Sequence, residues 1–215
     1  MNNVGFGSVR SYTDLGLWLT DVDISIPEPR RTVIDVPGRD GVLDLTSALT
    51  PRVRYKNRKI TLDFAMADYQ RRWISLFSAI VTALHGKQVN VVIEPDTDYY
   101  WDAFVTVDMA KCDRNKGTVR VVLDAYPYKY KAAETTVTVN ASYSGTLVTL
   151  TNSQMAVKPR FLASSAVTIT SGSKTYNLPA NTETQFDDFI LTEPSTEIIV
   201  TGTGTVTITY REGIL

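Results

Sequence analysis

The sequence Val33-Ile-Asp-Val-Pro-Gly-Arg-Asp-Gly-Val-Leu-Asp-Leu-Thr46 contains two apolar runs joined by the connection Pro37 to Gly41. Pro37-Gly38 fits the two central positions of a type II turn, because proline supplies the φ that the first position needs and glycine tolerates the positive φ of the second. Asp40-Gly41 is a second turn dipeptide, of the kind that joins antiparallel strands. We therefore predict a β-hairpin with a tight tip and with Arg39 at its outermost point.

Turn chemistry identifies a structure and not a function. The tip, which consists of Pro37, Gly38, Arg39, Asp40 and Gly41, is therefore either an ordinary surface hairpin or a contact with a partner. Both interpretations are compatible with the residues, and the tip is kept as a candidate interface.

Composition limits the classes of function. The 215 residues allow one large domain or two small ones, and a formal net charge of −1 leaves no basic excess to hold nucleic acid. The sole cysteine, Cys112, permits no intrachain disulfide, which fits folding in a reducing cytoplasm. We expect no membrane insertion, because the N-terminus lacks the features of a signal peptide and the apolar run Trp73 to Leu84 is too short to span a bilayer.

A basic run occupies residues 52–59, upstream of an alternating apolar strand that starts at Ile60. The change of phase between the two predicts a turn or bulge near Lys56-Asn57. Arg52, Arg54 and Arg58 form either a solvated strand face or a contact with acidic residues of another subunit. Further upstream, the alternation of Val22, Ile24 and Ile26 with Asp21, Asp23 and Ser25 predicts a half-buried strand, whose two aspartates share one face and repel each other.

An amphipathic helix is predicted from Asp68 to Gly86, with its core face formed by Trp73, Phe77, Ile80 and Leu84. Arg71 and Arg72 lie in its first turn, where the helix dipole disfavours positive charge. We take this as a sign that both arginines have acidic partners elsewhere, and we add them to the candidate inter-subunit contact. His85, in the last turn, is interpreted as a helix-end residue.

The fold class is predicted to be mainly β. Strands expected at 88–94, 99–109 and 118–126 give residues 1–130 an antiparallel sandwich with one packed helix and the hairpin. Residues 131–215 are rich in threonine and serine and show short apolar runs between turns, which is typical of a sandwich or barrel. The runs are 136–139, 146–151, 167–170, 176–178, 189–192, 198–201 and 206–210. We place a domain boundary near residue 130.

No converging set of reactive groups predicts an enzyme, a cofactor or a metal site. Three aspartate pairs are noted, namely Asp21/Asp23, Asp96/Asp98 in a turn and Asp187/Asp188 in a loop with nothing beside it. A calcium site at the turn pair is a less favoured alternative to an ordinary turn. Aromatic residues could form a sugar platform, either at Tyr99, Tyr100 and Trp101 or in the second domain, at Tyr143, Phe161, Tyr176, Phe186, Phe189 and Tyr210.

Several segments resemble the distal tail proteins of phages with long non-contractile tails. They are Gly16-Leu-Trp-Leu19, Ser25-Ile-Pro-Glu-Pro29, the hairpin Val36 to Thr46, Tyr55, the alternating stretch Arg58 to Phe64, and the closing Thr207 to Leu215. The resemblance implies a galectin-like second domain. It also implies a non-enzymatic hub at the tail tip of the virion, made in the cytoplasm of the host bacterium. A homo-hexameric ring of this hub would contact the tail tube protein, the tail-associated protein and receptor-binding proteins.

Two functions of different classes follow. The first is this structural hub, with residues 1–130 forming the ring and residues 131–215 projecting outward, since charge of both signs is concentrated in the first region and suits a repeated heterologous contact. The alternative is a carbohydrate-binding module for adhesion to the host surface.

Overall fold

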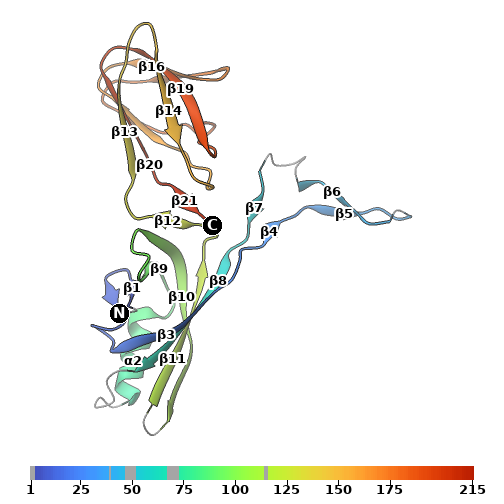
Figure 1. The fold of residues 1–215 in the computed structure, drawn as a ribbon, viewed down its shortest axis with the longest axis vertical. Coiled ribbons are helices and arrows are strands. Elements are labelled where there is room, and N and C mark those ends of the chain that lie inside the picture. Colours follow the sequence, from blue (N-terminus) through green and yellow to red (C-terminus); the bar gives the residue numbers. More distant parts are fainter. Residues whose placement is uncertain (1–2, 39, 47–51, 67–72, 114–115) are drawn as a thin grey trace. The chain divides into compact units, whose positions relative to one another are not determined.

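The computed structural model describes residues 3–38, 40–46, 52–66, 73–113 and 116–215. Contacts within the chain divide it into two units, Met1–Pro127 and Tyr128–Leu215, and each is described by itself (Figure 1). The fold is mainly β, with antiparallel sheets in both units, as predicted. The ring-forming role of the first region and the galectin-like character of the second stay predictions.

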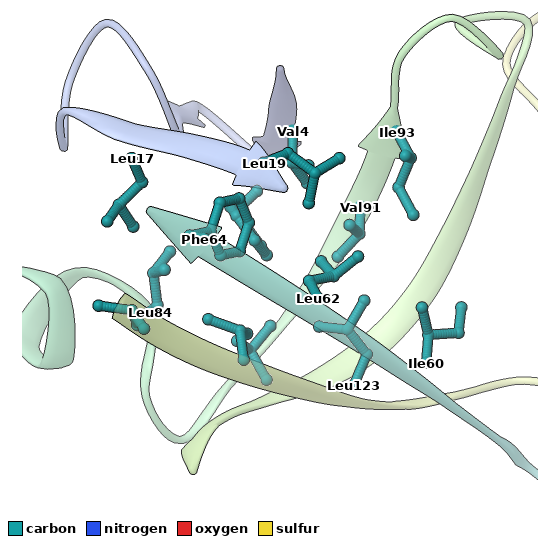
Figure 2. Packing of buried hydrophobic residues seen from close by; sticks show 14 of the residues in the cluster. Val4, Leu17, Leu19, Ile60, Leu62, Phe64, Leu84, Val91, Ile93 and Leu123 are labelled. Carbon is teal, nitrogen blue, oxygen red and sulfur yellow. The ribbon is translucent and has the colours of Figure 1, made fainter. Parts of the chain in front are cut away.

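The first unit is built on an antiparallel sheet with the strand order β2-β1-β9-β10-β11-β8-β3. The strands are β1 (Val4–Phe6), β2 (Val9–Arg10), β3 (Leu17–Ile24), β8 (Arg58–Met66), β9 (Lys87–Ile93), β10 (Tyr99–Asp113) and β11 (Lys116–Ala125). Helix α2 (Trp73–Leu84) packs on one face of this sheet. Figure 2 shows side chains of the strands, among them Leu62, Phe64, Val91 and Leu123, gathered with Leu84 of the helix in one core.

The stripe through which the helix packs shares Ile80 and Leu84 with the predicted one, and the side chain of the predicted Trp73 lies outside the described part of the structure. Leu76, Ile80 and Leu84 are buried, whereas Phe77 is 36% exposed. The expectation that Phe77 belongs to the core is therefore wrong, because the helix is rotated so that Leu76 takes that place. Gly86 ends the helix with a φ of 75°, as expected of a residue after a helix C-terminus. The predicted start at Asp68 lies outside the described residues.

Strand β3 is shifted by a bulge. Its register against β8 changes between Leu19 and Asp21, so Leu17 and Leu19 are buried while Asp21 and Asp23 lie on the opposite face. Of the predicted half-buried set, only Val22 is half-buried, since Ile24 is 41% exposed and Ile26 is 90% exposed and lies beyond the strand. An inserted residue changes which side of the sheet each following side chain occupies.

Two narrow ribbons lie between β3 and β8 along the chain (Figure 1). β4 (Pro29–Arg30) pairs with β7 (Arg54–Tyr55), and β5 (Val33–Asp35) pairs with β6 (Val42–Asp44). The break predicted near Lys56-Asn57 is confirmed, because β7 ends before it and β8 begins after it. We call residues 29–38, 40–46 and 52–55, which include both ribbons, the arm.

The second unit is a sandwich of two four-stranded antiparallel sheets, ordered β13-β20-β15-β18 and β14-β19-β16-β17. The strands are β13 (Thr135–Asn140), β14 (Thr146–Thr151), β15 (Arg160–Ala163), β16 (Val167–Ser171), β17 (Lys174–Leu178), β18 (Glu183–Thr184), β19 (Ser195–Gly202) and β20 (Thr205–Tyr210). Inward-facing residues of both sheets, such as Leu150, Phe161, Ile169 and Ile208, form one core. This alternation of buried and exposed positions explains the period-two pattern of the sequence.

Sequence patterns misassigned three segments of this sandwich. The run 189–192 is not a strand, although Phe189 and Leu191 are buried, and β15 and β18 were not predicted. Phe189 contributes to the core from a connection, with its ring 5.2 Å from that of Phe161. The unit also contains β12 (Lys129–Lys131) and β21 (Gly213–Ile214), which pair with each other in antiparallel orientation.

Candidate assembly interface

The hairpin formed by β5 and β6 has the predicted geometry. Val33 lies opposite Asp44, Ile34 opposite Leu43 and Asp35 opposite Val42. Gly38 has a φ of 81° and Gly41 a φ of 76°, the left-handed values that favour glycine at both turns. Nothing lies within 4 Å of where a Cβ would be added at either position, so the backbone conformation alone requires glycine there. Asp40 is exposed, and Arg39 lies outside the described residues.

Polar contacts hold the base of the hairpin. Arg31 donates to the Asp44 carboxylate, with a distance of 2.7 Å between Nη2 and Oδ2. The backbone N–H of Thr46 donates to Asp44 Oδ1 at 2.9 Å, and Thr32 N donates to Thr46 Oγ1 at 2.8 Å. Hydrogen bonds from Thr46, followed by those from Arg31, lower the pKa of Asp44 to about 2. These bonds define the orientation of the hairpin relative to the residues that precede it.

The arm exposes an unusual amount of apolar surface for so small an element. Val33, Ile34, Val36, Val42 and Val53 are each between 38% and 51% exposed. A two-stranded ribbon is marginally stable in isolation, and clustered exposed apolar side chains mark surfaces that meet a partner. The arm is therefore the first candidate interface of the chain.

The arginines predicted to form one contact do not share one surface. Arg52 and Arg54 are exposed on the arm, but Arg58 is 7% exposed and lies on the core face of β8 in phase with Ile60. Burial lowers the pKa of Arg58, and its Nε atom has no hydrogen-bond partner among the described residues. Arg58 is thus neither a solvated residue nor part of the exposed basic surface. Arg71 and Arg72 lie outside the described residues.

Sequence reasoning missed an arginine on the arm. Arg30 of β4 lies directly opposite Arg54 of β7, and both are exposed. The neighbouring charges are neutralised, because Lys56 donates to Glu28 at 2.9 Å and Arg31 pairs with Asp44. Arg30 was not found because pairing between strands that are far apart in the sequence has no local signal.

Among the described residues, neither predicted set of aromatic side chains forms a sugar platform. Trp101 is buried in the first core, so the predicted set Tyr99, Tyr100 and Trp101 does not present three rings together. In the second unit the rings of Phe161, Tyr176, Phe186, Phe189 and Tyr210 are buried or partly buried, and several of them pack on one another. Tyr143, at 83% exposure, is the one member of the predicted set on the surface.

The loop pair Asp187/Asp188 has basic partners, contrary to the expectation of nothing beside it. Lys158 pairs with Asp187 and Lys174 with Asp188, each at 2.9 Å. Across the ranges that the structure describes, no group of three or more histidine, cysteine, aspartate or glutamate residues is placed to hold a metal ion. His85 Nδ1 accepts a hydrogen bond from Val107 N at 3.1 Å, which matches its predicted role at the end of the helix. No helix of the described residues is long and apolar enough to cross a membrane.

Comparison with solved structures gives a match over the whole chain. No family model and no curated protein matches the sequence. The chain is similar in structure to the Dit protein (gp 19.1) of SPP1, described as a paradigm of the hub adsorption apparatus in phages that infect Gram-positive bacteria. The similarity covers 100% of both chains with a TM-score of 0.72 at 13% identity. A designed double-stranded β-helix covers 39% of this chain at 16% identity with a TM-score of 0.26, which carries no argument. The resemblance seen in the sequence is thus confirmed as a likeness of fold.

Proposed function

We propose that this chain is a structural hub protein of a phage tail tip. The observation that carries the proposal is the fold, which matches that of a phage hub adsorption protein from one end of the chain to the other. The segments of the sequence that resemble distal tail proteins support the same function, because that resemblance rests on the residues themselves and not on the fold. In this role the chain works by assembly, with no chemical step.

The assembly we propose is a homo-hexameric ring. Support comes from the arm, whose exposed valines and isoleucine form an apolar surface that one chain leaves open. A contact between the arm of one subunit and a different surface of the next is heterologous, and such contacts give a ring when the rotation closes. The tip residues Pro37, Gly38, Asp40 and Gly41 and the exposed Arg52 and Arg54 are the candidates for this contact.

The ring would join the tail tube protein above to the tail-associated protein below and would hold receptor-binding proteins outside. We assign ring formation to residues 1–130 and the outward attachment of adhesion proteins to residues 131–215. The protein would be made in the host bacterial cytoplasm and would reside at the tail tip of the virion. The alternative, a carbohydrate-binding adhesion module, receives little support, since most of the aromatic rings that it needs are in the core of the second unit.

The proposal is tested with the purified full-length chain. Light scattering coupled to size-exclusion chromatography should give a mass near six times that of the 23.9 kDa chain, and negative-stain electron microscopy should show annular particles. A monodisperse monomer at all concentrations and salt conditions would count against the hub. Binding to a glycan array without any annular assembly would favour the adhesion module instead.

A further inference from the structure

One face of the first unit's sheet carries carboxylates that the chain itself does not neutralise. Asp21 of β3 lies directly opposite Asp63 of β8, and Asp23 follows two residues later on the same face. Like charges directly opposite one another destabilise a sheet. Arg120 of β11 donates to Asp63 with two bonds of 2.7 and 2.8 Å. Within the described part of the chain, Asp21, Asp23 and the exposed Asp108 are left without a salt bridge.

The electrostatics of this face agree with its geometry. The hydrogen bonds from Arg120 lower the pKa of Asp63. The bond with Asp63 also raises the pKa of Arg120, and Asp108 and Asp21 add to that rise. One guanidinium therefore sits among three carboxylates, and the local charge is negative. We call Asp21, Asp23, Asp63 and Asp108 the aspartate face.

The arm carries the opposite arrangement. Arg30 and Arg54 form a cross-strand pair of like charges, and neither has a salt bridge among the described residues. Arg52 adds a third exposed guanidinium nearby in the sequence. The arginine pair, Arg30 and Arg54, is thus a second local repulsion that the single chain does not relieve.

The two surfaces are matched in spacing as well as in sign. Side chains directly opposite in an antiparallel pair have Cβ atoms about 5 Å apart, and residues two apart on a strand are about 7 Å apart. Two guanidiniums at the first spacing can each reach one carboxylate of the aspartate face, because arginine is long and forms short, charge-assisted bonds with carboxylates. Docking one surface on the other would remove both repulsions at once.

Exposed apolar side chains accompany both sets of charges. Trp18 and Phe104 project from the same side of the sheet as Asp21, being in phase with it across β8, β10 and β11, and they are 42% and 46% exposed. On the arm, Val53 is 51% exposed, and Ile26, which precedes the arm in the sequence, is 90% exposed. Apolar area combined with complementary charge is the composition of a protein–protein interface, in which the apolar area supplies affinity and the charges set register and orientation.

We infer that the arginine pair of one copy binds the aspartate face of the next copy. This inference rests on the proposed ring and names the surface that receives the arm. The occupant is a second copy of this chain, because the two surfaces are present in equal number on each copy and complement each other. The contact is heterologous, so every subunit offers one arm and accepts one.

A charge-reversal pair tests the inference on the full chain. Variant one carries Arg30→Glu and Arg54→Glu, and variant two carries Asp21→Lys and Asp23→Lys. Each variant should sediment as a monomer at concentrations where the wild type assembles. The dissociation constant of its self-association should be about tenfold or more above that of the wild type. Mixed in equal amounts, they should recover annular particles, because the acidic arm of one then meets the basic face of the other and the reversed order also matches. In a ring, the contact between arm and face is then restored between alternating copies of the two variants.

Two controls keep the result interpretable. Glu193→Lys with Glu197→Lys, at two exposed positions of the second unit, makes the same change of charge as variant two and should leave assembly unchanged. Melting curves should match the wild type, measured by tryptophan fluorescence for the reversal variants and by calorimetry for the control in the second unit. If a reversal variant does not fold, the neutral pairs Arg30→Gln/Arg54→Gln and Asp21→Asn/Asp23→Asn replace it, with weakened assembly expected from each.

The outcomes separate the two claims. A wild-type chain that never assembles overturns the ring and the inference together. Wild-type rings that persist in both reversal variants overturn the inference alone, as does a mixture of folded variants that stays monomeric. Recovery in the mixture, with no assembly of either variant alone, supports both.

Discussion

Replacing Ile80 by alanine should destabilise the first unit strongly. Ile80 is fully buried on the face of α2 that meets the sheet, between Leu76 and Leu84 one turn away on either side. Phe77, at 36% exposure, lies beside this stripe and gives a matched comparison on the same helix. Thr82, exposed on the helix, provides a control for the effect of an alanine substitution itself.

The magnitude follows from what the substitution removes. Alanine lacks three carbon atoms of isoleucine, and at about 0.8 kcal/mol for each buried methylene the transfer loss is about 2.4 kcal/mol. The cavity left in a close-packed core adds to this loss, which brings the expected cost to about 3–4 kcal/mol. Phe77→Ala should cost about 1–1.5 kcal/mol because its ring keeps part of its surface in water, and Thr82→Ala should change stability by less than about 0.5 kcal/mol.

Tryptophan fluorescence reports the unfolding of the first unit separately from that of the second. The three tryptophans of the chain, Trp18, Trp73 and Trp101, all belong to the first unit. Their emission therefore reports unfolding of that unit without interference from the second. For a unit of this size, the loss from Ile80→Ala should lower the Tm by about 10–15 °C, and urea denaturation should show a lower midpoint with an unchanged slope.

A reversed order of the two stability losses would refute the burial of Ile80 and the partial exposure of Phe77. Phe77→Ala as costly as Ile80→Ala, or more so, would mean that the helix packs through the stripe expected from periodicity. A full-stability Ile80→Ala variant would mean that α2 does not cover the sheet.

Three further predictions concern the arm, the roles of the two units and the hydrogen bonds of Glu212. Gly38→Val should cost about 1–3 kcal/mol of hairpin stability through backbone strain and should speed amide exchange in the hairpin and impair assembly, whereas Gly38→Asn should be tolerated; equal exchange in both would reject the turn assignment. Residues 1–130 expressed alone should form rings at low salt by light scattering, and a stable monomer beside full-length rings would reverse the roles of the two units. Burial raises the pKa of Glu212, but hydrogen bonds from Thr135, Ser153 and Lys131 outweigh it and the pKa lies below its usual value. The stability from Glu212 is therefore present above the ordinary pKa and lost as pH falls through the lower one, so calorimetry should show that Glu212→Gln destabilises the second unit at pH 7 by more than at pH 3, and an equal deficit at both would contradict this.

The sequence alone predicted the local backbone structure. Pro37-Gly38 and Asp40-Gly41 predicted the hairpin, because the backbone preferences of proline and glycine act within the turn itself and need no distant partner. The alternating strands β9, β10 and β11 and the end of α2 at Gly86 were found for the same reason, since the burial of every second residue and the left-handed C-terminal glycine are properties of short stretches.

Only the tertiary structure decided which side chains meet. The bulge after Leu19 sets which face Asp21 occupies, and the pairing of β4 with β7 sets Arg30 against Arg54, although the two arginines lie far apart in the sequence. The same holds for Arg58, whose place in a basic run suggests solvent but whose phase with Ile60 puts it on the core face. Register, bulges and the rotation of a helix are chosen by the combined burial of all packed elements, and that sum has no counterpart in any single stretch of sequence.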